Sequence, residues 1–446
     1  MNSNFHAVSL SEWLHHLENG VAGGYIEMGL ARVESVRKQM QLEPNCPVIV
    51  VAGTNGKGSV CAYLTQIYKE AGYRVGTLTS PHLLYFNERI AVNGQPVKDA
   101  EIISAFESIE AARGHTILTY FEFNTLAAVI IFNRQQTDIM ILEVGLGGRL
   151  DAVNIFDANV SVITSVDLDH EIYLGNTIEK VAYEKAGVMR TGKPTIFGQT
   201  DVPVSLQNYA QSIGANLLIY GKDFACINQD KSKWTFDFGC QNVTGLSDLH
   251  RAYNLPIPAL SGSFQLSNAA CAIAAVECLG EQLPVDVEAV KQGLIKVKLL
   301  GRFQILSEYP TVILDVGHNP HAARALRDSL KTLPAANKQL AVFSMLADKD
   351  IDTVLGIMND QIDKWYIAPL SLPRGLNIEK LQENFAKYDI NQISVFDNIC
   401  IAYQEALSHA SVNDRIVVFG SFHTVADIMA FLQMNAETHP EQRRLV

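Results

Sequence analysis

Short apolar runs alternate with longer segments of helical periodicity along most of the chain. Such runs are typical of strands buried on both faces, and the longer segments are typical of amphipathic helices. The alternation predicts an α/β protein with mostly parallel sheets. In the first part of the chain, strands are expected at residues 48–51, 74–79, 138–144 and 159–164, and helices at 9–17, 29–40, 59–71, 97–112, 122–134 and 176–186.

The pattern changes after Pro194, where the apolar runs become shorter. We interpret the runs at 217–220 and 234–238 as strands of a small antiparallel extension, and the segments 263–279 and 285–296 as helices. Regular alternation then resumes, which predicts a parallel sheet covered by helices on both faces. Strands are expected there at 311–314, 340–344, 364–367, 392–396 and 415–419, and helices at 321–333, 351–358, 378–387, 399–409 and 422–432.

A chain of 446 residues exceeds the usual size of a single domain, so two domains are expected. We place the boundary near Val297 to Gly301, which gives domains at residues 1–297 and 298–446. The second is expected to be a Rossmann-like α/β domain.

The strand at 48–51 ends in a glycine-punctuated loop that leads into a helical segment. The loop reads Gly53-Thr54-Asn55-Gly56-Lys57-Gly58-Ser59. Backbone N–H groups at such a place favour phosphate, Lys57 adds a cation, and Ser59 adds a hydroxyl that can bind Mg²⁺. The spacing departs from the standard P-loop, because Gly53 lies closer to Gly56-Lys57 and Gly58 precedes the serine. An ordinary glycine turn is the alternative, but the strand, the helix, the lysine and the serine favour a P-loop-type ATPase domain.

Polar side chains follow several other expected strands. Glu143 ends an otherwise apolar strand, and the segment 167–170, Asp-Leu-Asp-His, follows the next one. A polar loop at 79–83, Thr-Ser-Pro-His-Leu, lies beyond a further strand. Carboxylates at the carboxyl edge of a parallel sheet beside a phosphate loop are typical of Mg²⁺ sites, whereas a plain turn and a structural His170 are the alternatives. In the second domain, residues 315–320 (Asp-Val-Gly-His-Asn-Pro) follow the first strand, where ligands bind in such sheets.

Composition argues against a nucleic-acid-binding, a secreted or a membrane protein. The net charge of -12 argues against nucleic acid as a general partner, so an anionic substrate must meet a local basic site. The seven cysteines are scattered and lack metal-type spacing, which indicates reduced thiols in a cytoplasmic protein. No signal peptide is expected at the N-terminus. The longest clean apolar run, Leu126 to Phe132, is far shorter than the roughly 18 residues of a membrane span.

Further motifs accompany the glycine loop along nearly the whole chain. They are Thr-Ser-Pro-His-Leu (79–83), Phe-Asn-Glu-Arg-Ile (86–90), Leu-Glu-Val-Gly-Leu-Gly-Gly-Arg-Leu-Asp-Ala (142–152), Glu-Lys-Ala-Gly (184–187), Gly-Arg-Phe (301–303), His-Asn-Pro-His (318–321), Asp-Lys-Asp (348–350), Pro-Arg-Gly (373–375) and Gly-Ser-Phe-His-Thr-Val (420–425). With the glycine loop, this ordered set resembles the bacterial folylpolyglutamate synthases of the Mur ligase superfamily, in the bifunctional form that is also a dihydrofolate synthase. Two positions depart from the family pattern: Gly317 replaces the usual Ala, and Leu300 replaces the usual Pro.

The resemblance implies an ATP-dependent ligase that adds L-glutamate to dihydropteroate and to the γ-carboxylate of reduced folates. It also implies an ATP site between the domains and Mg²⁺, with two ions expected. The implied ATP-binding residues are Thr54, Asn55, Gly56, Lys57, Gly58, Ser59, Asn268, Arg302 and Asp315. The implied Mg²⁺ ligands are Ser80, Glu143, His170 and a carbamylated Lys185.

The resemblance further implies a substrate pocket. We assign to it Ser80, Thr119, Tyr120, Phe121, Glu122, Leu150, Asp151, Ala152 and His318. For the segment 119–122, the pattern alone equally allows core aromatic residues at the start of a helix. We expect catalytic roles for Lys57, His170 and Lys185.

Lys185 has two interpretations. It lies near the end of a helix, where a lysine commonly satisfies the last carbonyls before a glycine such as Gly187. Its apolar neighbours instead indicate a partly buried amine, whose pKa burial would lower. A neutral amine can add CO₂ to form a carbamate, and the resemblance favours that interpretation.

ATP would phosphorylate the acceptor carboxylate, and the amine of glutamate would then attack the acyl phosphate. We expect the domains to close during this reaction and the protein to be a monomer. A Mur-type ligase acting on a cell-wall precursor is one alternative, but it predicts a third domain. An ATP-binding switch that recruits a partner is another, but it would not need Glu143, His170 and Lys185 beside the phosphate loop.

Overall fold

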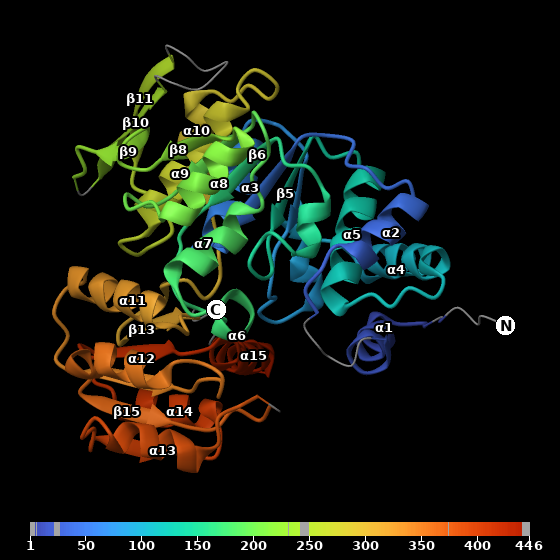
Figure 1. The fold of residues 1–446 in the computed structure, drawn as a ribbon. Helices are drawn as coiled ribbons and strands as arrows, with labels where there is room; N and C mark the ends of the chain where they lie inside the picture. Colours follow the sequence, from blue (N-terminus) through green and yellow to red (C-terminus); the bar gives the residue numbers. More distant parts are fainter. Residues whose placement is uncertain are drawn as a thin grey trace. The chain divides into compact units, whose positions relative to one another are not determined.

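The computed structural model describes residues 5, 7–21, 27–230, 232–240, 249–372 and 374–438. The chain forms two compact units (Figure 1). The first unit contains residues 1–259 and 265–297, and the second contains residues 260–264 and 298–446. Pro373 of the expected 373–375 motif and the residues after 438 lie outside the described part of the chain.

The first unit is built on an eight-stranded sheet in the order β4-β3-β2-β5-β1-β6-β7-β8. The strands from β2 to β8 in this order are parallel, and β3 and β4 add an antiparallel edge. Every residue of β1 is buried, as its apolar run predicts for a central parallel strand. The strands are β1 (Val48–Ala52), β2 (Val75–Leu78), β3 (Ile90–Val92), β4 (Gln95–Pro96), β5 (Ile139–Glu143), β6 (Val160–Ile163), β7 (Pro194–Phe197) and β8 (Asn216–Ile219).

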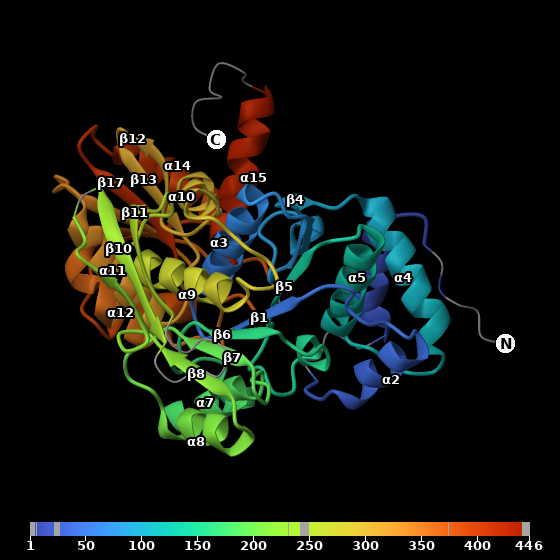
Figure 2. The ribbon, with the colours of Figure 1, turned by 90° about the horizontal axis from the view of Figure 1, so that it is seen from above.

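Helices of the first unit pack in groups against this sheet. α3, α9 and α10 lie together, with α3 against β1, β2 and β5 and α9 against β6 and β7 (Figure 2). Side-chain oxygens cap the helix N-termini at Ser9, Thr119, Thr177 and Asp286. The helices are α1 (Leu10–His16), η1 (Leu17–Val21), α2 (Ala31–Gln39), α3 (Lys57–Glu70), η2 (Phe86–Arg89), α4 (Asp99–Arg113), α5 (Tyr120–Arg134), η3 (Ala152–Ile155), α6 (Glu171–Leu174), α7 (Ile178–Ala186), α8 (Val204–Ile213), α9 (Gln265–Cys278) and α10 (Val287–Lys296).

The antiparallel extension differs in its strands from the sequence prediction. In the described residues it is formed by β9 (Phe224–Ile227), β10 (Lys233–Cys240) and β11 (Leu249–Pro256), in the order β11-β10-β9. The strand expected at 217–220 is β8, which pairs in parallel with β7, so its assignment to the extension was wrong. The reason is helix α8, a crossover between β7 and β8 that the sequence pattern did not reveal.

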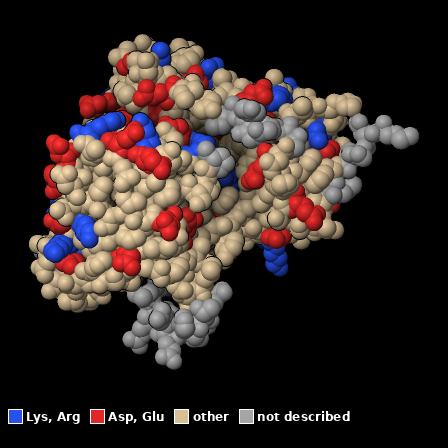
Figure 3. Space-filling model, turned by 90° about the horizontal axis from the view of Figure 1, so that it is seen from below, with Lys and Arg blue, Asp and Glu red and all other residues tan. Residues whose placement is uncertain are grey.

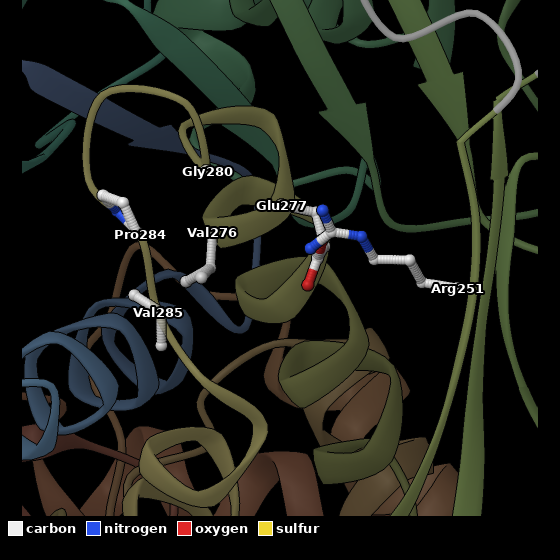
Figure 4. Close-up of a pocket in the computed structure, with 6 residues that line it drawn as sticks. All are labelled: Arg251, Val276, Glu277, Gly280, Pro284 and Val285. Atoms are coloured by element: carbon white, nitrogen blue, oxygen red, sulfur yellow. The ribbon is translucent and has the colours of Figure 1, made fainter.

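A small cavity of about 130 Å³ lies between β11 and the end of α9. Figure 4 shows the Arg251 guanidinium against the Glu277 carboxylate at this cavity. Their Nη1 and Oε2 atoms are 2.7 Å apart, and the Tyr253 hydroxyl donates to Oε1 of Glu277 at 2.9 Å. The ion pair therefore links the extension to the C-terminal end of α9. This end lies roughly 20 Å along the helix from Gln265, the first residue of α9.

The second unit has a six-stranded sheet in the order β12-β13-β17-β14-β15-β16. Only β12 is antiparallel, and this half-exposed edge strand was missed by the sequence analysis. Phe343, Trp365, Phe385 and Phe419 form an aromatic cluster in its core. The elements are β12 (Gln304–Glu308), β13 (Thr311–Asp315), α11 (Pro320–Thr332), β14 (Gln339–Phe343), α12 (Ile351–Met358), η4 (Asn359–Gln361), β15 (Lys364–Ile367), α13 (Ile378–Ala386), β16 (Ile393–Val395), α14 (Ile399–His409), β17 (Arg415–Phe419) and α15 (Phe422–Thr438).

The face in Figure 3 carries Lys and Arg side chains interspersed with Asp and Glu. None of the helices in the described ranges combines the length and the hydropathy that crossing a membrane requires.

Candidate functional site

The sheet of the first unit changes direction at β1 and β6. These strands are neighbours, but the chain leaves β1 through α3 towards β2 and leaves β6 towards β7 on the other side. Ligands bind outside the carboxyl ends of parallel strands where the connections diverge in this way. The loop after β1 is the phosphate loop expected from the sequence, and the loop after β6 carries His170.

Two glycines allow the phosphate loop to approach its neighbours closely. Gly53 has φ +146°, and a Cβ there would lie 1.9 Å from Oγ1 of Thr164. Gly56 is left-handed, with φ +88°, and its Cβ would lie 2.5 Å from Oδ1 of Asn268. Side chains at either position would therefore displace the loop from β6 or from α9.

Hydrogen bonds hold this loop against the end of β6. The Thr54 N–H donates to the Ser165 carbonyl at 2.8 Å, and the Asn55 N–H donates to Oγ of Ser165 at 3.0 Å. Oγ1 of Thr164 donates to the Asn55 carbonyl at 2.6 Å, and Oγ1 of Thr54 donates to the carbonyl of Asp167 at 3.0 Å. The loop is thus preorganised by contacts with residues more than a hundred positions away.

Lys57 begins helix α3, and its side chain folds back over the loop. Its Nζ donates to the carbonyls of Gly53 at 2.9 Å and Thr54 at 3.2 Å. Gly56, the N-cap, supplies no side-chain hydrogen bond to the first turn of α3. A helix N-terminus without a side-chain cap and with an adjacent lysine is suited to bind an anion.

The N-terminal turn of α9 meets the start of α3 through Gln265 and Asn268. Nε2 of Gln265 donates to Oγ of Ser59 at 3.2 Å, and Nδ2 of Asn268 donates to Oε1 of Gln265 at 3.3 Å. All three side chains are buried. Asn268 and Ser59 were expected at the ATP site from the sequence, whereas Gln265 was not. The signal that could have found it is its spacing of three residues from Asn268, which places both on one helix face.

Glu143 and Ser80 meet at the carboxyl ends of β5 and β2. The Ser80 N–H donates to Oε2 of Glu143 at 3.2 Å, and Glu143 is buried. Among the described residues, no group of three or more His, Cys, Asp or Glu side chains is arranged to hold a metal. Mg²⁺ needs no such cage, because it usually takes one or two carboxylates, phosphate oxygens and water. A buried carboxylate beside a phosphate loop fits that requirement.

His170 lies at the N-terminus of α6 in a left-handed conformation, with φ 52° and ψ 42°. Its Nε2 is 4.0 Å from Oδ1 of Asp169. Positive φ is uncommon for residues other than glycine and often marks functional loops. The loop after β6 therefore carries two adjacent polar side chains, Asp169 and His170.

Lys185 is buried in α7, with 3% of its surface exposed. Burial lowers the pKa of its amine to about 7; the charge of Lys57 acts in the same direction, whereas Asp169 and Asp151 oppose it. No hydrogen bond or ion pair joins this amine to another described residue, so it does not cap the last carbonyls of α7. The structure therefore supports the buried amine over the capping interpretation.

Asp151 is the second group with a strongly shifted pKa. Burial raises the pKa of its carboxyl to about 7, although the N–H groups of Leu146 and Val153 donate to it and Lys57 lowers the value. Lys57 and Lys185 each interact electrostatically with Asp151. The fold therefore brings together these three residues, all of which were expected at the site from the sequence.

The expected substrate segment 119–122 begins helix α5. Thr119 and Glu122 form a capping box, and Glu122 also accepts from Nη2 of Arg32 at 3.1 Å. A Cβ on Gly145 would lie 2.8 Å from the ring of Phe121, so this helix start lies against the loop that leads to Leu150, Asp151 and Ala152. The two segments expected to form one pocket are therefore adjacent.

In the second unit, Arg302, Asp315 and His318 gather around the carboxyl end of β13. Asp315 accepts from the N–H groups of Phe303 at 2.9 Å and Gly317 at 2.7 Å. Burial raises the pKa of Asp315, and Arg302 opposes that shift. The Arg302 guanidinium lies 4.8 Å from the ring centre of Phe422, and the His318 ring lies 6.0 Å from the same ring.

Comparison with known proteins matches residues 51–276 to the Mur ligase middle domain and residues 301–422 to the Mur ligase glutamate ligase domain. The dihydrofolate synthase/folylpolyglutamate synthase of Escherichia coli is 43% identical over 425 residues, which cover 95% of each chain. The chain belongs to the Mur ligase family, in the branch of these synthases.

Solved structures of the family agree with this membership. The E. coli FolC protein in complex with DHPP and ADP is 42% identical, with a TM-score of 0.89, and the match covers 96% of this chain and 99% of that one. A bifunctional folylpolyglutamate synthase/dihydrofolate synthase with Mn, AMPPNP and L-glutamate bound is 41% identical, with a TM-score of 0.86, covering 96% and 100%. The resemblance and the fold class expected from the sequence are thereby confirmed.

Proposed function

We propose that this Mur ligase adds L-glutamate to dihydropteroate and to the γ-carboxylate of reduced folates, with conversion of ATP to ADP. One observation carries the proposal. The phosphate loop, the Glu143–Ser80 pair and the buried Lys185 all lie at the same edge of one sheet. Relatives named for both synthase activities support the choice of substrates. Bound DHPP in one relative, and AMPPNP with glutamate in another, support the acceptor, the nucleotide and the amine.

Different residues of the first unit have different roles in phosphate binding and phosphoryl transfer. The loop N–H groups at the start of α3 and the Lys57 ammonium hold the ATP phosphates and offset the charge that develops as the γ-phosphoryl group moves to the acceptor carboxylate. Gln265 orients the Ser59 hydroxyl and the Asn268 amide towards this loop. We further assign Arg302 and Asp315 to nucleotide binding and His318 to substrate binding, as the resemblance to the family implies. The amine of glutamate then attacks the acyl phosphate, and phosphate leaves.

Ser80, Glu143 and His170 would hold Mg²⁺, which would neutralise phosphate charge when bound. The buried amine of Lys185 is suited to react with CO₂, because a large share of it is neutral near pH 7. The resulting carbamate would supply oxygen ligands for a second ion. Asp151, Leu150 and Ala152 would line the acceptor pocket with the segment 119–122.

A product assay tests the function. Purified protein is incubated with ATP, Mg²⁺ and L-glutamate, and with dihydropteroate, a reduced folate or a uridine nucleotide cell-wall precursor as acceptor. We expect ADP formation and a mass increase of one glutamyl residue with the first two acceptors only. Extension of the folate alone would make the enzyme monofunctional, and extension of the cell-wall precursor would refute the substrate assignment. ATP turnover that is independent of both glutamate and acceptor would instead support a switch. We expect a cytoplasmic monomer, which light scattering on a size-exclusion column would test for oligomeric state.

A further inference from the structure

Arg89 is a partly buried arginine at the junction of η2 and β3. Its Nε donates to Nδ1 of His82 at 2.8 Å. Its guanidinium lies 5.7 Å from the ring centre of Phe86 and 5.3 Å from that of Tyr120. Within the described ranges, the other guanidinium nitrogens of Arg89 have no hydrogen bond and no ion pair.

Other half-buried arginines of the first unit are neutralised by carboxylates. Arg32 pairs with Glu122 at 3.1 Å, and Arg113 pairs with Glu110 at 2.6 Å. Arg89 forms no ion pair with a carboxylate of the described residues; burial lowers the pKa of its guanidinium, and the nearby charges of Glu143, Glu18 and Glu88 raise it. A guanidinium remains protonated at neutral pH, so the described part of the fold holds a partly buried cation that no carboxylate contacts directly. Buried charges without an ion pair break the usual rules of folding, and such exceptions are concentrated at functional sites.

Arg89 lies at the same sheet edge as the site described above. Its carbonyl accepts from the Thr79 N–H at 2.9 Å, because β3 pairs with the carboxyl end of β2. The next residue, Ser80, donates its N–H to Glu143. Glu143 is also one of the charges that act on the pKa of Arg89. Tyr120, whose ring Arg89 approaches, belongs to the segment expected to bind the acceptor.

We propose that Arg89 binds the carboxylate of the acyl acceptor. A guanidinium can donate two parallel hydrogen bonds to a carboxylate, and the neighbouring, partly exposed ring of Tyr120 is suited to the aromatic part of such an acid. Lys57 holds the phosphates, so the site would provide one cation for the ATP phosphates and another for the acceptor carboxylate that they must approach. This inference rests on the proposed function. It assigns a ligand contact to the motif 86–90, which no other part of the site explains.

Binding measurements test the proposal without requiring turnover. Titration calorimetry would compare dihydropteroate with its carboxamide analogue, using the wild-type protein and Arg89→Gln. We expect Arg89→Gln to weaken binding of the acid by about 10- to 100-fold and to leave binding of the amide within about 2-fold. The matched control is Arg134→Gln, an exposed arginine of the same unit that hydrogen-bonds only Ser104 and Ser108. It should change neither affinity.

Parallel kinetics identify which carboxylate Arg89 binds. A rise in KM for both dihydropteroate and a reduced folate would indicate the carboxylate that reacts, whereas a rise for the folate alone would indicate its α-carboxylate. KM for glutamate should not change. Equal losses for the acid and the amide, or a rise in KM for glutamate, would overturn the proposal. If Arg89→Gln does not fold, Arg89→Lys retains the charge without the paired donors and should bind the acid about 10-fold more weakly. Failure of the wild-type protein to bind any acceptor would contradict the proposed function instead.

Discussion

Replacing Lys185 with methionine should stabilise the protein near neutral pH, and the gain should shrink as the pH rises. Burial lowers the pKa of this amine from 10.5 to about 7, so the folded state favours the neutral form. Between these two values the unfolded chain binds more protons than the folded one, and the stability of the wild-type protein therefore increases with pH. Methionine has no titrating group, so Lys185→Met lacks this increase.

The expected size follows from the pKa shift. One pKa unit corresponds to about 1.4 kcal/mol, so the wild-type protein should gain about 2 kcal/mol relative to Lys185→Met between pH 7 and pH 9. Asp151 does not disturb this comparison. Its pKa is raised from 3.8 to about 7, and a raised carboxyl pKa reduces stability as the pH rises through that lower window.

Urea unfolding at pH 7, 8 and 9, in buffers freed of CO₂, measures the two free energies of unfolding. The exposed Lys193 provides the control, because Lys193→Met should show no pH-dependent difference from the wild-type protein. A constant difference between Lys185→Met and the wild-type protein from pH 7 to pH 9 would refute the reasoning. Adding ¹³C-bicarbonate should then produce a carbamate carbon signal in the wild-type protein that is absent in Lys185→Met.

Three further predictions concern the phosphate loop and its neighbours. Lys57→Ala should abolish ligase turnover without lowering the melting temperature, and Lys57→Arg should not restore it because a planar fork replaces a compact ammonium. Glu143→Gln should raise the Mg²⁺ concentration needed for half-maximal rate; a fall in melting temperature that accounts for the lost rate would instead make it a structural carboxylate. Gly53→Ala should destabilise the loop by more than about 2 kcal/mol, since its Cβ would lie 1.9 Å from Thr164. Gly29→Ala is its control in urea unfolding, because Gly29 has φ +144° and no atom within 4 Å of the added Cβ, and equal losses for the two would rule out the steric cause.

Local pattern was sufficient for the elements that position the site. β1, the glycine loop and α3 follow one another within a short segment, so their apolar run, turn residues and helical periodicity could be recognised together. Parallel edge strands were harder, because β8 joins the sheet only through its pairing with β7 across α8. The antiparallel β12 was missed for a related reason, since a half-exposed edge strand has little apolar patterning.

The site residues show the same limit. Glu143 could be singled out from sequence because a carboxylate in an apolar strand contradicts its surroundings. For Gln265 the sequence offers only its spacing of three residues from Asn268, because its contact with Ser59, 206 residues away in the chain, is formed by the fold. Arg89 is similar: its motif was recognised, but only the folded structure shows that no carboxylate of the described residues forms an ion pair with it.

These residues share a physical property that separates them from the core. Four features oppose folding: the pKa shifts of Lys185 and Asp151, the left-handed backbone of His170 and the burial of the Arg89 guanidinium. All four lie around the carboxyl edge of one sheet. A core residue that is replaced should lose stability together with activity. A residue retained for chemistry should lose activity while stability is unchanged or improved. Lys185→Met is the sharpest case, because the removal of one buried ammonium is expected to raise stability and to abolish turnover in the same protein.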